Sequence, residues 1–111
     1  MTEPRLAAGI WVSAYLARLA IANIPAYILR RGDETAGAVM VKCATLDGRA
    51  SLWSREWNFD SDTRPWTLQH EGPEAEIDEA ARKQAGFDPD LWLIEIESRS
   101  GQTLLDQDGL A

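Results

Sequence analysis

The sequence predicts an α+β domain in which two helices pack on one sheet. Three observations predict it: an apolar N-terminal segment with helical spacing, a change to strand-like alternation near residue 26, and a charged helical segment followed by a short apolar run. The expected order is a helix, an antiparallel meander of about four strands, a second helix and a further strand completing the sheet. The 111 residues, 45% hydrophobic and 26% charged, suit a single domain over residues 1–111.

The first helix is expected over residues 4–23. Thr2 is a candidate N-cap, and Glu3 and Pro4 suit the first turn, because a carboxylate and a missing N–H are both tolerated there. Pro25 ends the helix, since the residue before a proline is pushed out of the helical region.

This helix is apolar around nearly its whole circumference, which predicts burial on more than one side. One face carries Leu6, Ile10, Ala17, Ile21 and Ile24, and a second carries Val12, Leu16 and Leu19. Such a helix either wedges against a sheet or also makes a subunit contact, so a homodimer through this helix is one expected arrangement. The interface candidates are Trp11, Tyr15, Leu16 and Leu19.

Six further elements follow. Strands are expected over residues 26–31, 38–45, 49–57, 66–70 and 91–97, and a second helix over residues 73–85. The second helix has acidic residues in its early turns and basic residues in its last, as the helix dipole favours, and Gly86 is its expected C-cap. The last strand is nearly all apolar, which suits the interior of a sheet. Residues 102–111 are expected to form a short extension or a frayed tail.

The turn between the second and third strands decides which side chains face the core. Asp47 and Gly48 favour a hairpin, because this pair supplies the positive φ that tight turns need. A two-residue loop would place Lys42 opposite Trp53, whereas a three-residue loop would place Val41 there. We favour the three-residue loop because it gathers one apolar set on a single face, namely Val39, Val41, Trp53 and Trp57.

The net charge of −7 is unevenly divided. Residues 1–57 hold seven basic and five acidic groups, a sum of +2, and residues 58–111 hold four basic and thirteen acidic groups, a sum of −9. This balance disfavours generic binding to nucleic acid or to an anionic membrane surface, because both would be repelled at long range. It leaves open a local basic face on the first half of the chain.

Nothing in the sequence predicts export or membrane insertion. The single cysteine, Cys43, permits no intramolecular disulfide and no cysteine-rich zinc site. Residues 6–24 have nearly the length of a membrane span, but Arg18 interrupts them and seven of the nineteen are alanine or glycine. We therefore expect a cytoplasmic protein without a membrane partner.

Catalytic signatures are missing: the sequence has no phosphate-binding loop, no paired cysteines and no nucleophile elbow. With His70 as its single histidine it predicts neither a metal site nor a cofactor, and we assign no catalytic residue. Glu95 and Glu97 lie at i,i+2 on one strand face, about 7 Å apart by strand geometry, and are the acid–base pair that an enzyme would use.

Two basic regions could hold an anionic ligand. In residues 30–37, Arg30 and Arg31 precede a loop that contains glycines, Asp33 and Thr35. Arginine pairs and loop N–H groups are common ligands of carboxylates and phosphates. The alternative, which we favour, is that one arginine pairs with Asp33 or the glutamate after it to hold the loop.

The second region combines arginine with tryptophan. Trp53, Trp57 and Trp66 lie near arginines in the sequence, a mixture that stacks single-stranded bases or anchors a protein. Its candidate ligand-binding residues are Trp53 and Arg55. The alternative, which we favour, is a tryptophan-rich core covered by arginine side chains, with cation–π contacts as a by-product.

Several motifs, taken in order, resemble a known family. They are residues 9–16 (GIWVSAYL), 24–27 (IPAY), 30–33 (RRGD), 36–38 (AGA), 72–76 (GPEAE) and 88–92 (DPDLW). Together they cover almost the whole chain and resemble the short alphaproteobacterial proteins of domain-of-unknown-function family 1491. The resemblance implies a bacterial single-domain protein, and it carries no activity, cofactor or site residue.

We therefore expect a non-catalytic cytoplasmic binding or protein-interaction module. One alternative is binding of an anionic small ligand or single-stranded nucleic acid by the arginine and tryptophan face. Another is a small enzyme that uses the loop of residues 30–37 with Glu95 and Glu97.

Overall fold

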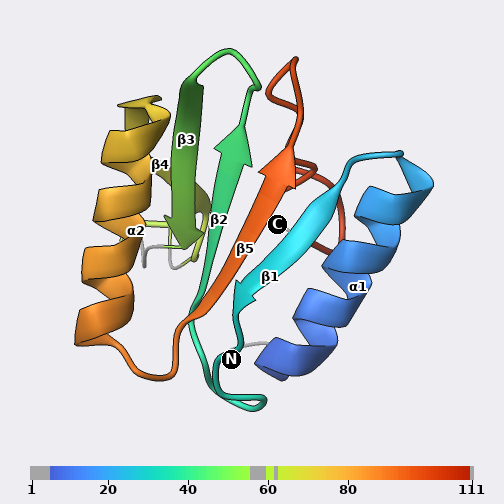
Figure 1. The fold of residues 1–111 in the computed structure, drawn as a ribbon. Helices are drawn as coiled ribbons and strands as arrows, with labels where there is room; N and C mark the ends of the chain where they lie inside the picture. The colour runs from blue at the N-terminus through green and yellow to red at the C-terminus, as the bar shows by residue number, and fades with distance from the viewer. Residues whose placement is uncertain (1–5, 56–59, 62, 111) are drawn as a thin grey trace.

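The computed structural model describes residues 6–55, 60–61 and 63–110. In chain order the elements are α1 (Ala8–Ile21), β1 (Ala26–Arg30), β2 (Val39–Ala44), β3 (Arg49–Arg55), β4 (Trp66–Pro73), α2 (Glu74–Phe87) and β5 (Trp92–Glu97). The α+β class and the order of the elements are confirmed (Figure 1). Within the described ranges, neither helix has the length and apolar character needed to cross a membrane.

The sheet is mixed, because its last strand enters the middle. The order across the sheet is β1-β5-β2-β3-β4, with β5 antiparallel to β1 and parallel to β2. β1 therefore does not pair with β2, and the unbroken antiparallel meander runs only from β2 to β4. The interior position of β5 explains its nearly continuous apolar sequence, since side chains on both of its faces are buried.

The hairpin between β2 and β3 has the predicted three-residue register. Val41 lies opposite Trp53, and both pack in the core that faces α1, together with Val39. Gly48 completes the turn with a φ of 86°, a left-handed conformation that glycine adopts without strain. The prediction for Trp57 lies outside the described residues.

Two cores lie on opposite faces of the sheet. On one face, α1 and the C-terminal tail cover the central strands, and α2 covers the other face through Ile77 and Ala81. The tail is not frayed over residues 102–110, because Leu104, Leu105 and Leu110 are buried in the same core as α1. These leucines supply the bulk that the alanine-rich helix lacks.

α1 begins at Ala8, later than predicted. Ala7 occupies the N-cap position and offers no side-chain cap. The N–H groups of Ala8 and Gly9 instead donate to the carbonyl oxygens of Thr35 and Glu34, at 3.2 and 2.9 Å. The predicted cap at residues 2–4 lies outside the described residues. A distant loop therefore satisfies the helix start.

Both helices end differently from the predictions. Asn23 adopts a left-handed conformation with a φ of 59°, and the N–H groups of Asn23 and Ile24 return to the carbonyls of Ala20 and Leu19. This Schellman motif ends α1 before the proline could do so. α2 continues one residue past Gly86, so that glycine is not its C-cap.

Candidate functional site

Three of the four interface candidates on α1 are buried within the chain. Trp11, Tyr15 and Leu19 pack between the sheet and the tail. The Tyr15 hydroxyl donates to the carbonyl oxygen of Thr103 at 2.8 Å, and burial raises the pKa of its phenol above the ordinary range. These three side chains cannot meet a partner in this fold, because the tail covers their side of the helix. Leu16 is half-buried.

The opposite side of α1 carries a separate apolar row, the α1 stripe, made of Ile10, Ala14, Ala17 and Ile21. These residues repeat at spacings of four, three and four, so they share one side of the helix. Ile10 is 59% exposed and Ile21 is 84% exposed. The stripe follows the first apolar face expected from the sequence, whereas Ile24 of that face is buried.

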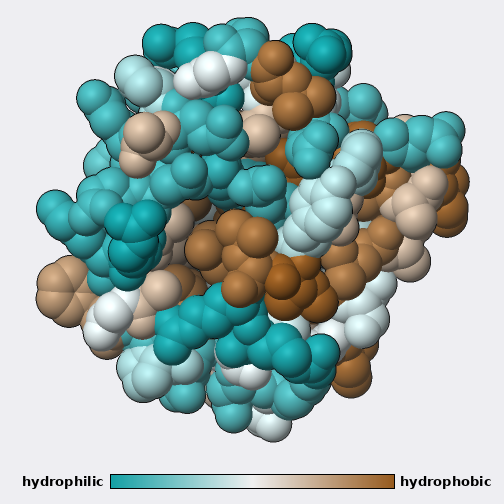
Figure 2. Space-filling model, viewed as in Figure 1, coloured by the Kyte–Doolittle hydropathy of each residue, from teal (hydrophilic) through white to brown (hydrophobic). Residues whose placement is uncertain are grey.

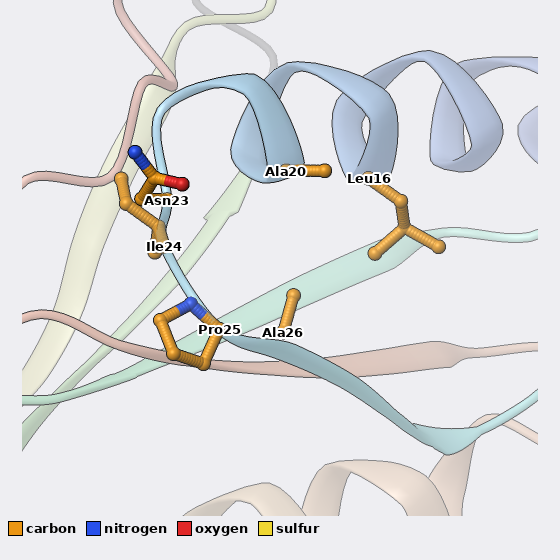
Figure 3. A pocket seen from close by; sticks show the side chains of 6 residues that line it. All are labelled: Leu16, Ala20, Asn23, Ile24, Pro25 and Ala26. Atoms are coloured by element: carbon orange, nitrogen blue, oxygen red, sulfur yellow. The ribbon is translucent and has the colours of Figure 1, made fainter.

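β1 lies at the edge of the sheet beside α1 and is also apolar. Tyr27, Ile28 and Leu29 are exposed in succession. A groove of about 500 Å³, the α1–β1 groove, is lined by Leu16, Ala20, Asn23, Ile24, Pro25 and Ala26. Leu16 points from the helix toward the strand, and Ala20 lies on the same edge of the helix (Figure 3). Figure 2 shows apolar side chains over β1 and α1, with hydrophilic residues around them.

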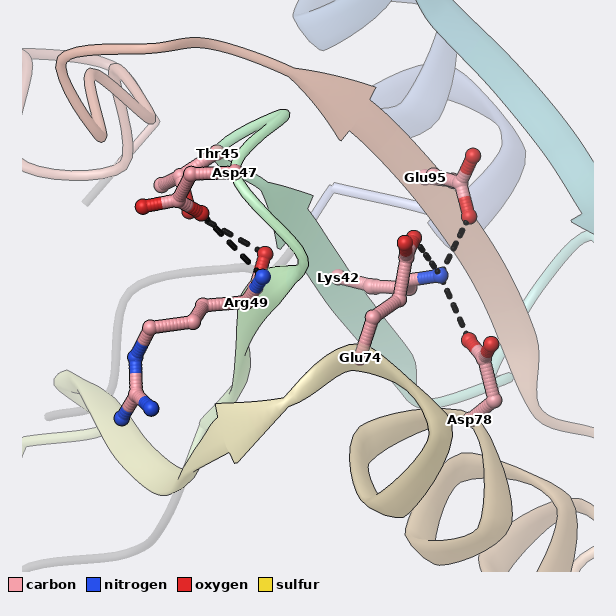
Figure 4. Close-up of polar contacts among 7 residues, drawn as sticks. All are labelled: Lys42, Thr45, Asp47, Arg49, Glu74, Asp78 and Glu95. Atoms are coloured by element: carbon pink, nitrogen blue, oxygen red, sulfur yellow. Dashed lines mark hydrogen bonds and ion pairs between the residues drawn. The ribbon is translucent and has the colours of Figure 1, made fainter.

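Among residues 6–55, 60–61 and 63–110, Lys42 is the one buried charged side chain, at 3% exposure. Its ammonium nitrogen lies 2.8 Å from Glu74 Oε2, 2.5 Å from Asp78 Oδ1 and 2.8 Å from Glu95 Oε1 (Figure 4). β2 and β5 place Lys42 directly opposite Glu95, and α2 brings the other two carboxylates over them. We call these four residues the Lys42 cluster.

The Lys42 cluster holds a fixed cation rather than a reactive amine. Burial alone lowers the pKa of Lys42, but hydrogen bonds to Asp78, Glu74 and Glu95 outweigh it, so the pKa is raised above the ordinary lysine value. The amine therefore stays protonated and is no nucleophile near neutral pH. One ammonium among three ionised carboxylates leaves a net charge of −2. The three carboxylates could reach a metal ion, but the ammonium takes that central position.

Sequence reasoning missed the Lys42 cluster, although a signal was present. Met40, Lys42 and Ala44 share one face of a strand, and only the lysine is charged. If that face is buried, the charge needs a partner. Glu74 and Asp78 lie at i,i+4 on one side of the second helix and are suited to provide it.

Arg30, a predicted ligand-binding residue, stabilises the end of α2. Its guanidinium donates to the carbonyl oxygens of Ala85, Asp88 and Pro89 at 2.5, 3.2 and 3.1 Å. The carbonyls of Ala85 and Asp88 lie at the C-terminal end of α2, the negative end of the helix dipole, where a cation is favourable. The side chain is thereby engaged at α2, away from the loop that it was expected to serve.

Arg31, Asp33 and Thr35 hold the loop before β2. Arg31 pairs with Glu34 at 2.6 Å, and its guanidinium carbon lies 5.3 Å from the centre of the Trp92 ring. The Asp33 carboxylate accepts hydrogen bonds from the N–H groups of Thr35 and the residue after it. The favoured interpretation, in which an arginine pairs with a loop carboxylate, is confirmed.

Arg55 and Trp66, two residues of the predicted arginine and tryptophan face, contact the chain's own tail. The carbonyl oxygen of Leu110 accepts three hydrogen bonds, from Trp11 Nε1 at 3.3 Å, Arg55 Nη2 at 2.6 Å and Trp66 Nε1 at 3.0 Å. The Arg55 guanidinium carbon also lies 5.6 and 5.0 Å from the centres of the Trp11 and Trp66 rings. These contacts agree with the favoured interpretation of a tryptophan-rich core covered by arginine.

Trp53 lies apart from this contact. Its indole N–H donates to the serine two residues earlier at 2.9 Å, and its ring borders a hollow of about 320 Å³. Arg49 and Arg99 line this hollow, and so do Asp47 and Glu71. Basic and acidic side chains therefore balance, and the hollow offers an anion no net positive charge.

Glu95 and Glu97 do not form a separate acid–base pair. Glu95 belongs to the Lys42 cluster. The Glu97 carboxylate accepts a hydrogen bond from the Tyr27 hydroxyl, and this bond raises the pKa of Tyr27. Arg30 is engaged at the end of α2. The structure thus does not assemble the parts that the enzyme alternative requires.

Comparisons with known proteins agree with this fold. The model of a protein family of unknown function, DUF1491, matches residues 6–106. A crystal structure of a DUF1491 family protein from Caulobacter crescentus CB15 is 36% identical with a TM-score of 0.84, over 92% of this chain and 96% of that chain. An NMR structure of a DUF1491 family protein from the same organism is 35% identical with a TM-score of 0.80, over 94% and 96%.

A more distant relative has the same fold. The solution structure of protein Atu0922 from A. tumefaciens is 29% identical with a TM-score of 0.71, over 86% of this chain and 87% of that chain. No curated protein matches the chain.

Proposed function

The chain belongs to the DUF1491 family, and from this premise we propose that it is a non-catalytic cytoplasmic protein-interaction module. The observation that carries the proposal is the α1 stripe, where Ile10 and Ile21 are largely exposed on a helix whose opposite side is buried. A row of apolar residues with this spacing suits packing against another helix. Water-facing apolar patches of this kind mark contact surfaces.

The distribution of charge supports the same surface. Arg18 is the single charged residue of α1, and it donates to the carbonyl of Asp108 at 2.5 Å. The acidic helix α2 lies on the opposite side of the sheet (Figure 1). A partner can therefore approach α1 without meeting the acidic residues of α2. A second copy fits too, since a two-fold axis would bring two uncharged stripes together.

Sedimentation over a range of protein concentrations tests the second copy as the partner. We expect Ile10→Glu and Ile21→Glu to shift the protein toward monomer, and Gln84→Glu on the exposed side of α2 to have no such effect. For another partner, a photo-crosslinking amino acid at position 21 should give a discrete adduct in cells, and one at position 84 should not. A protein that stays monomeric at high concentration and gives no adduct at position 21 would refute the proposal.

The other functions have no supporting observation among the described residues. Arg30, Arg31 and Arg55 donate hydrogen bonds within the chain rather than lining an open anion site. The carboxylates of an acid–base pair are likewise engaged, by Lys42 and Tyr27. The interaction surface on α1 is therefore the proposal that the geometry supports best.

A further inference from the structure

We infer that β1 is a docking edge for an extended, basic segment of a partner protein, which would add a sixth strand to the sheet. This inference goes beyond the α1 stripe, because it assigns a second surface and states the chemistry of what binds there. It rests on the proposed function only in that it requires a partner.

The first argument is the unpaired backbone of β1, which pairs on one side only, with β5. The N–H of Glu97 donates to the carbonyl of Pro25 at 3.0 Å. Hydrogen-bonded pairs alternate along an antiparallel ladder, so Tyr27 also belongs to the set bonded to β5. Ala26 and Ile28 therefore direct their N–H and C=O groups away from the sheet. The described part of the chain gives them no partner on that side.

The second argument is that β1 lacks the protection that edge strands usually have. The other edge strand, β4, carries His70 and Glu71 and ends in Pro73, and such residues discourage edge pairing. β1 instead exposes three apolar residues in a row before its first charged residue, Arg30. A bulge between Ile28 and Arg30 limits the open edge to the first half of the strand, so the docked segment is short.

The faces of β1 specify the side chains of the added strand. A residue opposite Ala26 would point to the α1 side, toward the groove that Ala26 lines together with Leu16 and Ala20 (Figure 3). This position calls for an apolar side chain. A residue opposite Tyr27 would point to the other face, where Glu95 lies beside Tyr27 on the next strand.

The charge on that second face selects a basic segment. Tyr27, Glu95 and Lys42 are successive cross-strand neighbours and therefore share one face. The Lys42 cluster contributes a net charge of −2, and the Glu97 carboxylate, held by the Tyr27 hydroxyl, adds to it. A lysine or arginine opposite Tyr27 would be attracted by this negative charge and would lie against the aromatic ring of Tyr27. An antiparallel second copy would instead bring further carboxylates to the same face.

Hydrogen exchange and calorimetry with two synthetic peptides test the inference. The probe is a capped hexapeptide of alternating lysine and valine, and the control has glutamate in place of lysine. We expect the lysine peptide to slow exchange at the amides of Ala26 and Ile28 at least tenfold, and the glutamate peptide to leave both unchanged. Absence of protection at these two amides, or equal protection by the glutamate peptide, would overturn the inference.

Substitutions separate backbone pairing from general attraction between charges. Ile28→Pro removes the outward N–H and should weaken binding of the lysine peptide at least tenfold, whereas Ile28→Val, which keeps that N–H, should not. If the proline variant fails to fold, Ala20→Trp fills the groove from the helix and leaves the strand intact. Ala14→Trp, on the α1 stripe, is its control. Equal binding by Ala20→Trp and Ala14→Trp would count against docking at β1.

Three outcomes distinguish this inference from the proposed function. If the Ile28 amide of the protein alone becomes protected as its concentration rises, a second copy occupies β1 and the basic segment is wrong. If Ile21→Glu abolishes self-association while peptide protection at Ile28 persists, both surfaces act independently. A protein that stays monomeric at high concentration and gives no adduct at position 21, but keeps peptide protection at Ile28, would refute the α1 proposal alone.

Discussion

Replacing Lys42 by methionine tests whether the Lys42 cluster holds α2 to the sheet. The substitution keeps an apolar stem and removes the ammonium from among three carboxylates. Removing one partner of a buried ion pair costs about 3–5 kcal/mol. The side chains of Glu74, Asp78 and Glu95 are 42%, 44% and 22% exposed, so water can solvate them in part. We therefore expect the free energy of unfolding to fall by about 3 kcal/mol, the lower end of that range.

Urea unfolding, followed by tryptophan fluorescence, measures this loss. With a slope of about 2 kcal/mol per molar urea, a loss of about 3 kcal/mol lowers the midpoint by about 1.5 M. Lys83→Met, at an exposed position of α2, is the matched control and should change the free energy by less than about 0.5 kcal/mol. If Lys42→Met moves the midpoint no more than this control does, the cluster does not stabilise the fold.

Adding acid or calcium distinguishes two causes of the stability lost in Lys42→Met, namely repulsion among the carboxylates and lost packing. In Lys42→Met the three carboxylates repel one another in the folded state, because no cation lies between them. Acid neutralises carboxylates and so relieves this repulsion, and the stability of the variant should therefore approach that of the wild type as the pH falls. Calcium should also stabilise the variant selectively, since the ligand oxygens lie within 4.8 Å of one another. If neither acid nor calcium reduces the difference in free energy of unfolding between the variant and the wild type, the lost stability comes from packing.

Three further predictions concern the tail, α2 and pH. Leu110→Ala should lower the free energy of unfolding by about 2–4 kcal/mol in urea, because its side chain is fully buried; an unchanged midpoint would exclude the tail from the core. Arg30→Met should lower the free energy of unfolding by about 1–2 kcal/mol, because carbonyls at the end of α2 lose their hydrogen-bond donor. Amide hydrogen exchange in the last turn of α2 should become faster, and unaltered exchange there would contradict this role. The free energy of unfolding should fall above about pH 10, because Lys42 and Tyr15 have higher pKa values in the folded state than in the unfolded chain. Their contribution to stability is complete below the unfolded pKa, and it is lost as the pH rises toward the folded pKa. Fluorescence-monitored unfolding should show a shallower alkaline fall for Tyr15→Phe; a profile flat from pH 8 to 12 would refute the assignment.

Local sequence patterns predict where the strands of this protein lie better than they predict which strands pair with one another. The pairing of Val41 with Trp53 follows from a short turn and from the alternation of apolar residues, both of which lie within a dozen residues. The parallel pairing of β5 with β2 joins segments about fifty residues apart and leaves no periodic trace. The apolar run of β5 predicts an interior strand, but it does not name the strands on either side.

The sequence also did not predict which distant groups the long side chains contact. Arg30 resembles a ligand-binding arginine until the end of α2, 55 residues later, is placed beside it. Tyr15 and Trp11 resemble interface residues until residues 102–110 cover them. Where a counter-group lay nearby, as for Arg31 and Glu34, the sequence did predict the pair.

The α1 stripe can be tested without disturbing the fold, and this separates it from the rest of the helix. Replacing Trp11 or Leu19 would open a cavity in the core, so a lost interaction could not be told from lost folding. Ile21 is 84% exposed, and its replacement by lysine should change the free energy of unfolding by less than about 0.5 kcal/mol. An Ile21→Lys protein that unfolds at the wild-type midpoint, yet loses the adducts given by a photo-crosslinking amino acid at the exposed stripe position 17, would identify the stripe as a contact surface. An Ile21→Lys protein that keeps them would leave the stripe as ordinary exposed helix, because nothing in the monomer needs that side chain.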